Sequence, residues 1–319
     1  GVATGDQGLV ELGAYLADIP VTFVASSIFI IIAGLAVLIS TKNVMKIALA
    51  MFIFNILGYV LLLGSMLISG HDSFVAGLAK NGIDYNGIID AARSGGYVFG
   101  VAASGIMLGI VYGFLNCAGY THSAYISGEM KSPQQLKTQM TAIIGSVVLL
   151  CVLSAAAYAV AYYVLGFDFV HALSFLWNTR DPAYTMPFMI PGSLNLLAYM
   201  TSSAPLIMIT SVLWFVAFWS LPFATMFMMS RNIFAWSFDR VIPSRFSAVT
   251  RQGVPYLSVV LAIIIALIFN VAYIFTNIAA FMVYQALGWA IAWVFVGIAA
   301  IAFPLSLIHI SEPTRQAEI

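Results

Sequence analysis

Long apolar stretches separated by short polar segments dominate this chain. Seven of these stretches reach about 20 residues or more, the length that an α-helix needs to cross the hydrocarbon core of a bilayer. They cover residues 20–40, 47–68, 97–127, 142–165, 205–229, 256–275 and 278–303. No Asp, Glu, Lys or Arg lies inside any of them. The pattern therefore predicts an all-α, polytopic membrane protein with one transmembrane domain over residues 1–304.

The charged residues lie between the apolar stretches and fall into two alternating sets. One set has eight basic and two acidic residues, and the other has three basic and eight acidic residues. The basic members of the first set are Lys42, Lys46, Lys131, Lys137, Arg231, Arg240, Arg245 and Arg251. Because basic residues are enriched in cytoplasmic loops, we expect the segments 41–46, 128–141 and 230–255 to be cytoplasmic in a multi-pass protein of the plasma membrane.

The two long segments on the opposite side are expected to contain short helices. Residues 69–96 and 166–204 combine Gly, Pro, Asn and Asp with apolar residues, a mixture that predicts short helices at the membrane interface. Residues 1–19 predict another such helix, because Leu9, Leu12 and Leu16 are spaced by three and then four positions.

Composition excludes several classes of protein. The chain is 62% hydrophobic and 8% charged, with a mean hydropathy of +1.01, whereas average soluble domains are about 25% charged. Its formal net charge is zero, so bulk charge indicates no nucleic acid partner. The two cysteines, Cys117 and Cys151, both lie in apolar stretches and are too few for a thiol metal site. We therefore predict no metal and no cofactor.

The third apolar stretch contains a pattern that predicts a break in its helix. Gly105, Gly109 and Gly113 recur every four residues and open one face to close approach by another helix. A run of weak helix formers follows near mid-membrane, comprising Asn116, Cys117, Ala118, Gly119 and Tyr120. Broken backbone in a bilayer is tolerated where it is buried in protein or lines a cavity. The run is thus a candidate binding site for a small polar molecule; the alternative is a continuous helix in which Ala118 and Gly119 only pack.

Other polar residues of the apolar stretches are weaker candidates. Tyr112 lies one turn before Asn116 and can extend the same face, or simply pack. His122 is ionisable within the membrane and can make transport depend on pH, or it can be neutral and bonded to a carbonyl. Three lone amides, Asn55, Asn270 and Gln285, predict hydrogen bonds between helices.

Glu129 and Arg231 lie at predicted cytoplasmic helix ends. They can form a gate, or they can be exposed charges whose pairing contributes about 0–1 kcal/mol.

Three motifs make the chain resemble the amino acid–polyamine–organocation transporter superfamily, amino acid permease type. The first is Gly119-Tyr120, then Ala124, then Gly128-Glu129-Met130-Lys131-Ser132-Pro133. The second is Ser230-Arg231-Asn232-Ile233-Phe234-Ala235 followed by Asp239-Arg240 and Pro243, and the third is Gly253-Val254-Pro255. Their order and spacing make the resemblance specific over about residues 20–304.

The resemblance implies a transporter fold of two inverted five-helix repeats, with substrate between the discontinuous first and sixth helices. The seven stretches would be the fourth to tenth helices of a family that usually has twelve, so the chain would begin in mid-protein. Residues 97–127 would form the discontinuous helix. In sodium-coupled relatives, hydroxyls on the helix that corresponds to 205–229 bind the ion. Ser220 and Thr225 beside Pro222 are candidates for that role, although Pro222 can also be a packing kink.

Residues 305–319 are interpreted separately. They resemble the translation of a sequencing adapter read into the gene, and a native cytoplasmic tail is the alternative. We expect them to be non-native and exclude them from the fold prediction.

The predicted function is secondary active transport of amino acids or related organic amines by alternating access, without covalent catalysis. The apolar or neutral walls favour a small neutral amino acid, with Na⁺ or H⁺ as the coupling ion. One alternative is a membrane subunit of an ion-translocating enzyme complex, which would carry ionisable pairs in mid-membrane. The other is a channel, which would show a pore-lining repeat or a charged ring.

Overall fold

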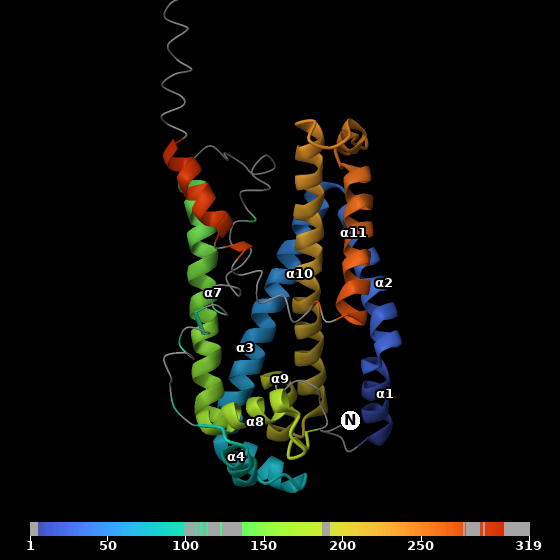
Figure 1. Cartoon of the computed structure of the whole chain (residues 1–319). Helices are drawn as coiled ribbons and strands as arrows, with labels where there is room; N and C mark the ends of the chain where they lie inside the picture. Colours follow the sequence, from blue (N-terminus) through green and yellow to red (C-terminus); the bar gives the residue numbers. More distant parts are fainter. Residues whose placement is uncertain are drawn as a thin grey trace, which may run out of the picture. The chain divides into compact units, whose positions relative to one another are not determined.

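The computed structural model describes residues 6–98, 100, 106, 109–110, 113, 122, 136–186, 192–276, 278, 288–289 and 291–302 (Figure 1). Across this part of the chain the regular structure is helical, with no strand. Five helices are long and apolar enough to cross a membrane. The predicted fold class, an all-α polytopic membrane protein, is therefore confirmed.

The helices with printed bounds follow one another along the chain with few residues between them. They are α1 (Gln7–Ala17), α2 (Ile19–Val37), α3 (Thr41–Lys80), α4 (Tyr85–Ser94), α7 (Leu136–Leu165), α8 (Phe167–Thr179), α9 (Ser193–Met200), α10 (Ala204–Phe238), the 3₁₀ turn η2 (Ser244–Ser247) and α11 (Tyr256–Phe275). The segments 69–96 and 166–204 hold the second arm of α3 together with α4, α8 and α9, and α1 lies within 1–19. The helices expected in these segments are thus present.

The helix α3 is longer than its apolar stretch because it continues through a kink. Gly70 has φ 74° and ψ 173°, a conformation that glycine adopts far more readily than other residues. Beyond the kink, the second arm carries Phe74 and Leu78 into a buried cluster. Hydropathy alone did not predict this arm, because it contains His71, Asp72 and Lys80.

The chain divides into two compact units. The first comprises Gly1–Val101 and Gly119–Asn270, and the second Ala102–Ala118 and Val271–Ile319. In the second unit the structure describes the end of α11 and the exposed helix Ile291–Ala302. The packing described below lies in the first unit.

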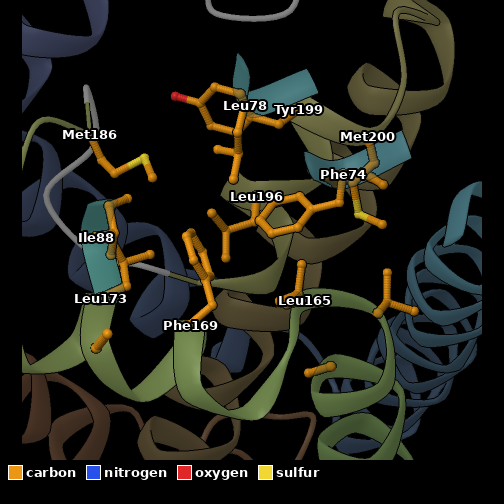
Figure 2. Close-up of a cluster of buried hydrophobic side chains, with 14 of the residues drawn as sticks. Phe74, Leu78, Ile88, Leu165, Phe169, Leu173, Met186, Leu196, Tyr199 and Met200 are labelled. Carbon is orange, nitrogen blue, oxygen red and sulfur yellow. The ribbon is translucent and has the colours of Figure 1, made fainter. Parts of the chain in front are cut away.

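One buried cluster, here called the short-helix cluster, joins the ends of α3 and α7 to α4, α8 and α9 (Figure 2). Its side chains are Leu62, Met66, Phe74, Leu78, Ile88, Ile89, Ala92, Ala161, Val164, Leu165, Phe169, Ala172, Leu173, Leu176, Met186, Leu196, Leu197, Tyr199 and Met200. Phe74 and Phe169 meet edge to face with ring centroids 5.3 Å apart. Full burial of each Leu or Phe contributes about 1.5–3 kcal/mol, so these short helices are held by tertiary packing.

A second buried cluster, the long-helix cluster, joins α2, the start of α3, α10 and α11. It comprises Ala33, Val37, Val44, Met51, Phe223, Met226, Phe227, Ile233, Val254, Val259 and Ala262. The helices approach closely here, because a Cβ atom on Gly34 would lie 2.3 Å from the Ile263 side chain. The chain segments at this end carry the basic residues at positions 42, 46, 231, 240, 245 and 251, whereas Asp72, Asp84, Asp90 and Asp168 belong to the helices of the short-helix cluster.

Candidate functional site

The predicted substrate-binding run lies outside the described residues. It consists of Asn116, Cys117, Ala118, Gly119 and Tyr120, together with Tyr112. Glu129 of the predicted gate also lies outside them, and the break in the helix stays a prediction. His122 is described as helical and partly buried.

The helix α10 runs through Pro222 as one element, and both candidate hydroxyls bond to their own helix. Ser220 Oγ donates to the Ala217 carbonyl at 2.6 Å. Thr225 Oγ1 donates to the Leu221 carbonyl at 2.9 Å. Each hydroxyl oxygen keeps lone pairs that can accept or coordinate. However, five positions on an α-helix correspond to about 140° of rotation, so the structure does not bring the two hydroxyls to one ion.

Arg231 is buried near the end of α10, with 8% of its surface exposed. Its Nη2 donates to Thr41 Oγ1 at 3.0 Å, and its Nη1 donates to Ser230 Oγ at 3.2 Å. The guanidinium carbon lies 4.1 Å from the centre of the Phe227 ring, a cation–π geometry. The interpretation of Arg231 as an exposed helix-end charge is therefore wrong. The side chain ties α10 to the first residue of α3.

Asn270 forms a three-residue polar contact between α2 and α11. Its Nδ2 donates to Ser26 Oγ at 2.9 Å and to Ser27 Oγ at 3.0 Å, and Ser26 Oγ lies 3.1 Å from Asn270 Oδ1. A polar side chain in hydrocarbon is satisfied by such contacts between helices. The prediction that Asn270 bonds between helices is confirmed.

A comparison with protein families determines the class of protein. The model of a family described as amino acid permease matches residues 7–305, a range that includes both buried clusters and the predicted break. The chain belongs to the amino acid permease family. This is a family of membrane transporters, not of enzymes, and membership confirms the resemblance inferred from the motifs. No curated protein and no solved structure matches the chain.

Sequence reasoning missed a polar junction in the permease where α7 ends and α8 begins. His71 Nδ1 lies 2.8 Å from the Val164 carbonyl, and Tyr85 donates its hydroxyl to the Leu165 carbonyl at 3.1 Å. These carbonyls lie in the last turn of a helix, where the chain itself supplies no partner. Gly166 follows with φ 90°, and a Cβ atom there would lie 2.1 Å from the Tyr85 hydroxyl oxygen. The unusual feature in the sequence was a glycine directly between two helical segments.

Burial changes the acidity of groups around this junction. It raises the pKa of the Tyr85 hydroxyl, and the charge of Asp168 raises it further. Burial raises the pKa of Tyr184 to about 12, with a smaller contribution from Tyr199. For His171, burial lowers the pKa while Asp168 opposes that change. Its Nε2 is buried and has no hydrogen-bond partner among the described residues, so its neutral form is favoured.

Two indole N–H groups of the permease lie on α10. The Nε1 atoms of Trp214 and Trp219 are buried without an acceptor in the described part of the chain. Trp214 stacks on Tyr59 of α3 with ring centroids 5.5 Å apart. Trp219 meets Phe29 of α2 edge to face at 6.3 Å. Both side chains therefore pack between membrane helices, as the sequence analysis expected first.

Proposed function

We propose that the chain carries small neutral amino acids across the cell membrane by alternating access, driven by a gradient of Na⁺ or H⁺. The observation that supports this proposal is the match to the amino acid permease family over residues 7–305. Five long apolar helices supply the membrane domain that such transport requires.

The substrate site in this proposal is the broken segment at Asn116–Tyr120, extended by Tyr112. Where a helix breaks, the freed N–H groups of one half favour an anionic group, and the freed carbonyls of the other half accept from an ammonium. A zwitterionic amino acid presents both groups. The predicted spans contain no Asp, Glu, Lys or Arg, which favours a neutral side chain over a dibasic one.

Ion coupling is assigned to groups that can bind or carry a cation within the membrane. Ser220 and Thr225 have oxygen lone pairs on the helix with Pro222, and only one of them is expected to reach a given ion, because they point in different directions. His122 is the candidate for proton coupling. Arg231, bonded to Thr41 and Ser230, is proposed to close the cytoplasmic side together with Glu129.

The orientation in the membrane is the one that the charges favour. The basic residues of the α2–α3 and α10–α11 connections gather at the end of the long-helix cluster. Under the positive-inside rule this end faces the cytoplasm.

Uptake into proteoliposomes tests the function. The purified chain is reconstituted, and uptake of labelled alanine and lysine is followed with an inward Na⁺ gradient, an inward H⁺ gradient or neither. We expect saturable alanine uptake that one gradient increases, with little lysine uptake. Gly119→Val should abolish it by adding a β-branched side chain at the break. Gly145→Val is the matched control, because the space around a Cβ atom at Gly145 of α7 is open. Absence of saturable uptake for every amino acid and amine would overturn the proposal.

A further inference from the structure

The helix α1 exposes its apolar side chains instead of burying them. Leu9 and Leu12 are each 50% exposed and Leu16 is 54% exposed. No residue of α1 is buried, and the element that it contacts is α2. An 11-residue helix is too short to be stable in water on its own, so a further surface is needed to cover these leucines.

Polar and apolar residues of α1 lie on opposite faces. Leu9, Leu12 and Leu16 share one face, at spacings of three and four. Glu11 and Asp18 each follow a leucine by two positions, which corresponds to about 200° around the helix. This is the arrangement of a helix that lies along the boundary between an apolar and an aqueous phase.

Hydrogen bonds hold α1 beside the start of a membrane-spanning helix. Asp18 ends α1 and is also the N-cap residue of α2. Thr22 Oγ1, in the first turn of α2, donates to the Leu16 carbonyl of α1 at 3.1 Å. The apolar surface of α2 begins at once, since Ile19 is 58% exposed. The exposed leucines are therefore adjacent to the lipid that surrounds α2.

We propose that α1 lies in the outer interface of the bilayer, with Leu9, Leu12 and Leu16 covered by lipids whose headgroups have no net charge. The segment 6–18 contains Asp6, Glu11 and Asp18 but no Lys or Arg. Helices that bind anionic lipids carry basic residues on the polar face, and these three carboxylates would instead be repelled by such headgroups. This inference does not depend on which solute the chain carries.

Photo-crosslinking of the full chain in nanodiscs tests it. A benzoylphenylalanine residue is introduced as Leu12→benzoylphenylalanine or, as the matched control, as Glu11→benzoylphenylalanine on the opposite face. The discs contain phosphatidylcholine alone or a mixture with phosphatidylglycerol. After illumination, the adducts are identified by intact-protein mass spectrometry.

We expect a phosphatidylcholine adduct at position 12 in several-fold excess over position 11. The yield should fall when phosphatidylglycerol is added. Cross-linking of position 12 mainly to a second copy of the chain would overturn the proposal, as would equal lipid adducts at the two positions. A yield that rises with phosphatidylglycerol would overturn the preference for neutral headgroups.

Discussion

The two ends of the first unit use polar side chains for different purposes. At the short-helix cluster, His71 and Tyr85 bond to the last backbone carbonyls of α7 and shape the turn into α8. At the long-helix cluster, Arg231 bonds to Thr41 on another membrane helix. The polar bonds therefore complete the backbone at one end and join helices at the other.

This difference has an energetic consequence. A carbonyl near a helix end can exchange a lost side-chain partner for water. A buried donor between membrane helices has no such substitute, and its desolvation is not compensated. We therefore expect the short-helix end to depend mainly on shape and burial, and the long-helix end to depend more on its polar contacts.

The largest effect is expected from Gly77→Val in the second arm of α3. A Cβ atom at Gly77 would lie 1.6 Å from the Tyr199 carbonyl oxygen, so α3 and α9 must separate. The loss should reach the upper part of the range of about 1–3 kcal/mol typical of overpacking. Thermal unfolding in detergent measures it. Gly64→Val on the same helix is the control, because the space around its Cβ is open. Equal effects of the two variants would contradict the importance of shape at this end.

The next effect is expected from Thr41→Val at the long-helix end. This change removes an acceptor from the buried guanidinium of Arg231. A hydrogen bond to a charged group contributes about 1.5–3 kcal/mol. Thr210→Val is a buried control whose hydroxyl bonds to Leu206 of its own helix. If Thr210→Val lowers the melting temperature as much as Thr41→Val does, the contact between helices is not the cause.

A smaller coupling is expected between Ser26 and Asn270. In a double-mutant cycle with Ser26→Ala and Asn270→Ala, the interaction free energy should be about 0.6–1.7 kcal/mol, as for other hydrogen bonds between membrane helices. Ser146→Ala on α7 replaces Ser26→Ala in the control cycle, since Ser146 bonds within its own helix. That cycle should show additive effects. Additivity of Ser26→Ala and Asn270→Ala would mean that the contact does not stabilise the pair of helices.

The smallest effect is a pH dependence at the short-helix end. Because burial lowers the pKa of His171 below 6.5, the unfolded chain binds a proton there more readily than the folded chain. The stability from neutral His171 is therefore present above about pH 6.5 and is lost as the pH falls through the folded pKa. His171→Phe should reduce the drop in melting temperature on acidification. An unchanged drop in this variant would show that other groups cause it.

The sequence predicted the membrane helices well where hydropathy decides their extent. α11 has the predicted bounds of 256–275, because an apolar run ends where the bilayer ends. α3 and α10 continue past their apolar runs, because packing and local hydrogen bonds set those helix ends. The amide of Asn270 predicted a partner on another helix, since a lone amide in hydrocarbon needs one.

Contacts across the chain could not be predicted from one sequence. Thr41 and Arg231 are 190 positions apart, and Ser26 and Asn270 are 244 apart. Arg231 was assigned to a helix end from its position, and its burial follows from packing that no local pattern encodes. For the substrate site, the glycine spacing and the family motifs supply the prediction, and its residues lie outside the described part of the chain.

Protection of Cys117 by substrate tests the central claim most directly. The chain in proteoliposomes is treated with N-ethylmaleimide with and without alanine, and labelling of each cysteine is measured by mass spectrometry. Cys151, exposed on α7, is the internal control. A site at the break predicts that alanine slows labelling of Cys117 and leaves that of Cys151 unchanged. Labelling of Cys117 that no transported amino acid alters would contradict it.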